Sequence, residues 1–168
     1  MKRPILTTLL LLATLTLAAC ANPNRLGGAG AGGAGGFGAA GDPSDPRTVA
    51  YFNQSIGDRV LFAVNQSTLT PEAQLVLSQQ AAWLSTNTQY SALIEGHADE
   101  QGTREYNLAL GERRANAVRE FLISQGVAGS RLRTISYGKE RPIELCSDES
   151  CYAQNRRAVT VLAAGAGV

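Results

Sequence analysis

A strand followed by a long amphipathic helix is expected in residues 90–125, which read YSALIEGHADEQGTREYNLALGERRANAVREFLISQ. The strand covers Tyr90 to His97, and the helix runs from about Thr103 to Gln125, since Gly126 stands where glycine commonly ends a helix. Apolar side chains recur at helical spacing and define the face turned to the sheet: Leu110, Ala117, Val118, Phe121 and Leu122. This stretch predicts one strand–helix unit of an α/β domain.

Further strands and helices flank this unit on both sides. Residues 60–64 are a short apolar run typical of a buried strand, and Thr70-Pro71-Glu72 supplies the cap, proline and acid that begin a helix ending near Ser85. Two more strands are expected at 132–137 and 158–162, with an irregular stretch at 138–150 between them. Alternating strands and helices predict a βαβ-based sheet with helices packed on it and with parallel, helix-linked strands.

The N-terminus has the pattern of an export signal. Lys2 and Arg3 precede an apolar run at 5–19, roughly 15 residues against the about 20 that span a bilayer. The run ends in Leu17-Ala18-Ala19-Cys20, which resembles the bacterial lipobox, where a peptidase cuts before the cysteine and its thiol is lipidated. The alternative is an ordinary signal peptide with Cys20 present by chance. Because alanine and not aspartate follows the cysteine, the sorting rule of enteric lipoproteins favours the outer membrane.

Glycine and alanine dominate the segment after this leader. Residues 28–33 happen to match the G-x-G-x-x-G pattern of dinucleotide folds, but neither flank offers the required strand or helix, so no cofactor is expected. As a random coil, residues 21–46 would have ends about 28 Å apart, and roughly 90 Å when fully stretched. We therefore expect a leader at 1–19, a lipidated Cys20 with a flexible tether over 20–57, and a folded domain at 58–168.

The three cysteines divide into one plus two. If Cys20 is acylated, Cys146 and Cys151 remain as a pair in an oxidising compartment, where disulfides persist. Such a bridge would contribute roughly 2 kcal/mol by closing a small loop. A metal site is the rival interpretation, but two thiols with no nearby histidine make half a zinc site, so a structural disulfide is favoured and no metal is expected.

Charge and motifs argue against several classes of function. The formal net charge is +1, and removing Lys2 and Arg3 leaves 13 basic against 14 acidic residues, so there is no electrostatic footprint for nucleic acid. His97 is the only histidine, and no G-x-S-x-G nucleophile motif occurs. A carboxylate pair among Glu95, Asp99 and Glu100 leaves a glycosidase interpretation open. We expect a protein that is not an enzyme, with His97 as a hydrogen-bonding residue at the strand end.

Arg114 lies within the apolar stripe of the long helix, three or four residues from Leu110, Ala117 and Val118. A buried arginine needs an anionic partner, which is either a protein carboxylate or the carboxylate of a ligand. Asp99 is the obvious counterpart, because it follows a strand at its carboxyl end, where ligands bind in such sheets. Spacing alone favours an Asp99–Arg114 ion pair over a split site in which Asp99 takes an ammonium and Arg114 takes a carboxylate.

Several motifs together resemble the OmpA-like peptidoglycan-binding domain and, more narrowly, the peptidoglycan-associated lipoproteins. They are EGHADEQGT at 95–103, EYN at 105–107, LGERRANAV at 110–118, ISYGKERP at 135–142 and NRRAV at 155–159. The resemblance covers about residues 59–162. It implies an α/β domain (an α+β sandwich) of order βαβαββ, with a mixed sheet and helices packed on one side.

The resemblance also implies a ligand and partners. In this family, the residues matching Asp99 and Arg114 hold the free amino-acid end of meso-diaminopimelate in the peptidoglycan stem peptide. Asn107 matches a position with polar contacts, Asn65 lies in a loop lining the same groove, and Arg156 lies near the site or forms a charged edge before the last strand. The family implies an outer-membrane lipoprotein that faces the periplasm, binds peptidoglycan and works with TolB and TolA during envelope constriction.

The sequence departs from the family at the end of the first strand. Members often read Phe-Asp-Phe-Asp where this chain has Phe62-Ala63-Val64-Asn65, so both acids of that strand end are missing. The Cys146/Cys151 pair is absent from many members. Two alternatives remain open: a wall-anchoring lipoprotein independent of the Tol proteins, and an enzyme acting on the wall.

Overall fold

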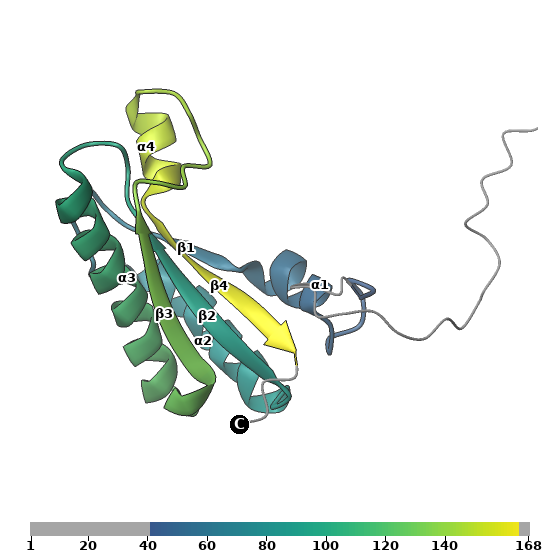
Figure 1. Ribbon diagram of the computed structural model, residues 1–168. Helices are drawn as coiled ribbons and strands as arrows, with labels where there is room; N and C mark the ends of the chain where they lie inside the picture. Colours follow the sequence, from purple (N-terminus) through teal and green to yellow (C-terminus); the bar gives the residue numbers. More distant parts are fainter. Residues whose placement is uncertain (1–40, 165–168) are drawn as a thin grey trace, which may run out of the picture. The chain divides into compact units, whose positions relative to one another are not determined.

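The computed structural model describes residues 41–164 (Figure 1), so the expected leader, Cys20 and the tether up to residue 40 lie outside the described residues. The elements are α1 (Val49–Tyr51), the π-helical turn η1 (Phe52–Gly57), β1 (Arg59–Leu61), α2 (Pro71–Thr86), β2 (Tyr90–His97), α3 (Arg104–Ser124), the 3₁₀ turn η2 (Gly129–Arg131), β3 (Leu132–Gly138), α4 (Glu149–Asn155) and β4 (Arg157–Ala164). The long helices begin at threonine caps, because the Thr70 and Thr103 hydroxyls accept hydrogen bonds from backbone N–H groups of the first turn.

The strands form one mixed sheet in the order β1-β4-β2-β3. β2 and β3 are parallel and are linked by α3, as the alternating pattern predicts. β1 and β2 do not pair with each other, because β4 inserts between them and runs antiparallel to both. The predicted fold class, a mixed sheet with packed helices, is confirmed.

Helices α2 and α3 share one hydrophobic core with the sheet. Leu77 and Leu84 of α2, Val118 and Leu122 of α3 and Ile94 of β2 are all at most 1% exposed. In Figure 1, α2 lies behind the sheet and α3 runs alongside β3. The two helices pack against each other and share the same core, which agrees with helices on one side.

The end of β2 and the middle of α3 approach so closely at Gly96 and Gly111 that neither of these residues can carry a side chain. A Cβ atom added at Gly96 would lie 1.8 Å from the carbonyl oxygen of Gly111, and one added at Gly111 would lie 2.8 Å from the carbonyl oxygen of Gly96. This backbone contact brings Arg114, about one turn further along α3, close to the end of β2 and the residues that follow it.

The packed domain begins earlier than residue 58, where the sequence analysis placed its boundary. Residues 49–57 are helical, and Phe52 is fully buried with its ring 5.0 Å from that of Trp83. The Trp83 indole N–H also donates to the carbonyl of Pro46, at 2.6 Å. Val49, Tyr51 and Ile56 also pack against the core. The segment is too short to show a helical or strand period, so the sequence analysis places it in the tether.

The structure also contains α4, in the region where the sequence analysis expected an irregular stretch and then a strand. Asp148 caps this helix by accepting from the N–H groups of Ser150 and Cys151. Among the residues described, no helix is both long and apolar enough to cross a bilayer.

Candidate functional site

The predicted site residues come from four segments that meet at one end of the sheet. Asp99 follows β2, Asn107 and Arg114 lie on α3, Asn65 lies in the loop after β1, and Arg156 joins α4 to β4. Four of these side chains are nearly or wholly buried, and Asn65 is exposed. The carboxyl end of β2 therefore does gather charged groups, as the sequence predicts.

Arg114 is wholly buried and is bonded to the backbone instead of to a carboxylate. Its guanidinium donates to the carbonyl oxygens of His97 (2.7 Å), Gln66 (2.8 Å) and Ala63 (3.1 Å), and its Cζ lies 5.2 Å from the centre of the Phe62 ring. Burial lowers its pKa to about 10, and the nearby charge of Asp99 opposes this shift, so the group stays positive at neutral pH. The arginine thus ties the loop after β1 to the end of β2.

Asp99 pairs with a different arginine from the one expected. Its Oδ2 accepts from Arg156 at 3.1 Å, and its Oδ1 accepts from the backbone N–H of Gln101 at 3.2 Å. The Asp99–Arg114 ion pair that spacing favoured is not formed, because backbone carbonyls occupy the Arg114 guanidinium. The Asp99 side chain is 10% exposed and that of Arg156 is 5% exposed, so this pair is nearly buried but reachable from solvent.

Arg156 binds a second carboxylate, that of Glu149 at the start of α4. Its Nη2 donates to Glu149 Oε1 in a short hydrogen bond, and its Nη1 lies 3.4 Å from Oε2. Hydrogen bonding to Glu149 raises the Arg156 pKa most, with Asp99 adding to the shift, and it lowers the pKa of Glu149. Arg156 also donates through Nε to the carbonyl of Phe62, at 3.2 Å, which anchors it to the first-strand loop.

Asn107 and Lys139 hold the loop that carries Asp99. Asn107 is 1% exposed and donates to the carbonyl of Gln101 at 2.8 Å, while its Oδ1 has no partner within residues 41–164. Lys139 Nζ donates to the carbonyls of Glu100 (3.3 Å) and Gly102 (2.7 Å). The exposed Asn65 adopts a positive φ of 54° and accepts from the hydroxyl of Tyr106 at 3.3 Å.

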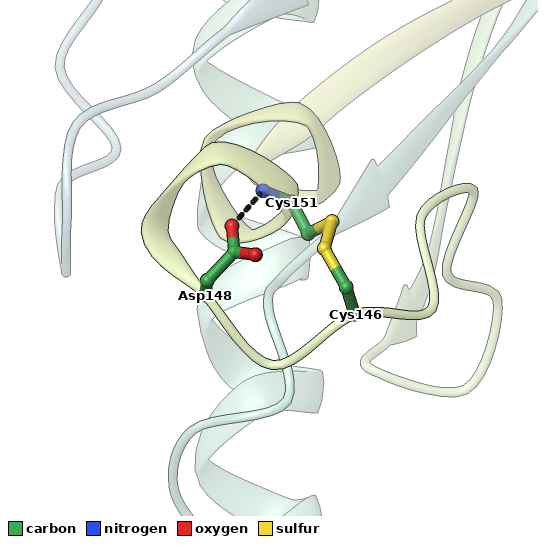
Figure 2. A group of neighbouring side chains, drawn as sticks. All are labelled: Cys146, Asp148 and Cys151. Carbon is green, nitrogen blue, oxygen red and sulfur yellow. Dashed lines mark hydrogen bonds between the residues drawn. A yellow bond between two sulfur atoms is a disulfide. The ribbon is translucent and has the colours of Figure 1, made fainter.

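The cysteine pair forms the predicted disulfide. Cys146 and Cys151 are bonded across the turn that begins α4 (Figure 2), and Asp148 between them accepts from the Cys151 N–H at 3.2 Å. These three residues could hold a metal only as free thiols and a free carboxylate. Here both sulfurs are joined and the carboxylate caps the helix, so the group is a structural clamp.

Comparison with known proteins assigns this arrangement to a family. The OmpA family model matches residues 61–156, which include every residue of the site described above. The chain belongs to the OmpA family. A protein of Mesorhizobium japonicum called peptidoglycan-associated lipoprotein is 51% identical over 99% of this chain and 95% of its own length. One of the same name in Rhizobium meliloti is 49% identical over 99% of this chain and 90% of its own length.

Solved structures agree with the OmpA family assignment. The peptidoglycan-associated lipoprotein from Burkholderia pseudomallei is similar with a TM-score of 0.64 and 40% identity, covering 72% of this chain and 99% of that one. The C-terminal domain of Helicobacter pylori MotB has a TM-score of 0.60 at 21% identity, covering 65% of this chain and 86% of that one, and this likeness concerns the fold alone.

The side chain of His97 differs from the expectation of a hydrogen-bonding residue at the strand end. Its side chain is buried beside the ring of Tyr137, at 5.5 Å between centroids. Its Nε2 lies 3.5 Å from Glu95 Oε2, which is too long for a well-formed hydrogen bond, and neither ring nitrogen has a hydrogen-bond partner in the described part of the chain. Burial and the charges of Arg157 and Arg141 lower its pKa to about 3, so the ring is neutral at physiological pH. The prediction of a hydrogen-bonding side chain was wrong; only the His97 backbone carbonyl contributes, by accepting from Arg114.

Sequence reasoning missed Glu149 as part of the site. Asp148 followed by Glu149 is the cap-and-acid signal of a helix start, and it was present in the sequence. No local pattern, however, connects Glu149 to an arginine that lies beyond the end of that helix and also reaches Asp99.

Proposed function

We propose that this chain is a lipid-anchored outer-membrane protein whose periplasmic domain binds peptidoglycan without cutting it. The proposal rests on membership of the OmpA family and on near full-length relatives named peptidoglycan-associated lipoprotein. The observation that carries it is Asp99, a nearly buried carboxylate at the carboxyl end of β2 with two arginines beside it. A zwitterionic amino-acid end, such as that of meso-diaminopimelate, has the complementary charges.

Asp99 is the group proposed to take the ligand ammonium. Each carboxylate oxygen can accept two hydrogen bonds, and each Asp99 oxygen is engaged once, so further capacity remains. Asn65, Asn107 and Arg156 are proposed to line the same site. In this proposal Arg114 remains central. Its part is to fix the loop after β1 and the end of β2 around the ligand, and to supply a buried positive charge beside Asp99.

The proposed place in the cell follows from the sequence of the leader. Cys20 would carry the lipid, the Gly/Ala-rich segment would span the distance to the wall, and the domain would lie in the periplasm. We further propose that the protein works with TolB and TolA in maintaining the outer membrane during division. Co-purification of TolB with the mature chain tests this step. If TolB does not co-purify, the protein is a wall anchor that acts independently of the Tol proteins.

A pull-down with isolated cell walls tests the binding itself. The chain from Ala21 onward, exported with an ordinary cleavable leader so that the disulfide forms, should sediment with sacculi containing meso-diaminopimelate. Asp99→Asn keeps the shape but removes the charge, and we expect that variant to stay in the supernatant. Sacculi with lysine in place of diaminopimelate serve as the control and should retain little protein.

Two results would contradict the proposal. If Asp99→Asn sediments as well as the unmodified chain, Asp99 is not the ligand contact. If soluble fragments are released from the sacculi during incubation, the domain is an enzyme acting on the wall.

A further inference from the structure

The Arg156 guanidinium faces two carboxylates that differ sharply in exposure. The Asp99 side chain is 10% exposed, whereas that of Glu149 is 67% exposed. Arg156 itself is held in place from behind by the hydrogen bond from its Nε to the carbonyl of Phe62. Of the two carboxylates, Glu149 is the one that can exchange its bond to Arg156 for hydration with a small loss of free energy.

Glu149 meets Arg156 in the geometry that a ligand carboxylate would adopt. Both of its oxygens face the same edge of the guanidinium, one toward Nη1 and the other toward Nη2. This two-pronged arrangement is the characteristic way in which arginine binds a carboxylate. The edge is therefore occupied by a group from the protein itself.

The start of α4 keeps Glu149 at that position. Asp148 caps the helix immediately before it, and the Cys146–Cys151 disulfide closes the short loop that contains it. Three residues after Glu149, the Tyr152 hydroxyl donates to Glu100 at 2.7 Å, which ties α4 to the loop after β2. Glu149 is thus presented to Arg156 from a braced turn and not from a free loop.

We propose that Glu149 is an internal competitor for the ligand carboxylate and sets the affinity and selectivity of the site. This inference rests on the proposed function and deepens it. On binding, the carboxylate of the diaminopimelate end takes the Arg156 edge, Glu149 turns out to solvent, and Asp99 keeps its own bond to Arg156 while receiving the ammonium. No covalent bond changes. A ligand without that carboxylate leaves Glu149 where it is.

The test compares Glu149→Gln with the unmodified chain, each spanning Ala21 to the C-terminus with the disulfide formed. The probe is a soluble muropeptide whose stem peptide contains meso-diaminopimelate, titrated by calorimetry. Because an exposed ion pair contributes modestly, removing the competing charge should tighten binding by roughly two- to fivefold. Glu144→Gln is the matched control, since Glu144 is an exposed acid on the same loop whose carboxylate makes no hydrogen bond among the described residues; its affinity should be unchanged.

A second probe separates competition from a general effect on the fold. With the diaminopimelate carboxylate amidated, the ligand no longer competes with Glu149, so both proteins should bind it equally weakly. If the unmodified chain binds the first muropeptide but Glu149→Gln binds it no tighter, or tightens equally on the amidated one, the competitor role is refuted. If the unmodified chain binds neither muropeptide, the proposed function fails and this inference fails with it.

Discussion

Replacing Arg114 by methionine should destabilise the domain by about 4 kcal/mol. Methionine fills a similar volume but donates no hydrogen bond, so the carbonyls of His97, Gln66 and Ala63 lose their partner. A buried acceptor left without a donor costs about 1–3 kcal/mol. The bond to His97 is fully buried and belongs at the upper end, while Ala63 and Gln66 lie in an exposed loop where water can replace part of the loss.

This loss is large for a domain of ordinary stability, about 5–15 kcal/mol. Urea unfolding followed by circular dichroism measures it directly, and in a thermal scan the midpoint should fall by about 12–20 °C. Arg113→Met is the matched control, because Arg113 is the exposed neighbour on α3 and should change stability by no more than about 0.5 kcal/mol. If Arg114→Met is within about 1 kcal/mol of the unmodified domain, the guanidinium is not what holds these segments together, and its main partner must be the ligand.

Two further predictions concern β2, the strand that Asp99 follows. Gly96→Ala should destabilise the domain by about 2–4 kcal/mol in the same urea assay, because its Cβ would lie 1.8 Å from a backbone oxygen of α3 and one of the two elements must move; unchanged stability would mean that the contact is looser than described. For His97, burial lowers the pKa to about 3 in the folded state, against the ordinary value of 6.5 in the unfolded chain. The unfolded chain therefore binds more protons between these values, and stability falls as the pH drops through this window. The expected contribution is up to about 1.4 kcal/mol per pH unit, and His97→Gln should flatten the curve of unfolding free energy between pH 6 and 4; an equally steep curve in the variant would assign that dependence to other groups.

The elements that could be predicted from the sequence are those with a strong local signal. The two long helices begin at their threonine caps, and β2 and β3 lie side by side because a single helix links them. No local signal predicts that β4 lies between β1 and β2, because the order of the strands depends on how the whole sheet is completed. Phe52 illustrates the same limit: the apolar segment that contains it is too short for a periodic signal, and its place in the core becomes clear only when Trp83 is seen beside it.

The sequence predicts which residues form the candidate site better than it predicts which of these residues bond to each other. Asp99, Arg114 and Arg156 do meet, because the carboxyl end of β2, α3 and the start of β4 converge. Which arginine bonds to Asp99 depends on side-chain reach of a few ångströms, and the carbonyls that occupy Arg114 belong to a loop whose course no periodicity describes. Sequence spacing predicts which residues take part, but the course of the loop after β1 determines which groups they bond to.

The central place of β4 also has a consequence for the order in which the domain can be built. Arg157–Ala164 (β4) pairs with β1 on one side and with β2 on the other. β2 can pair with β3 before β4 is available, but β1 has β4 as its only partner strand in the described sheet, so β1 cannot join the sheet earlier. Arg156 directly precedes this strand and is positioned by it. When the chain emerges from its N-terminal side, β1 therefore stays unpaired and Asp99 lacks its bond to Arg156 until β4 has emerged. The topology thus makes the Asp99–Arg156 pair one of the last parts of this domain to form.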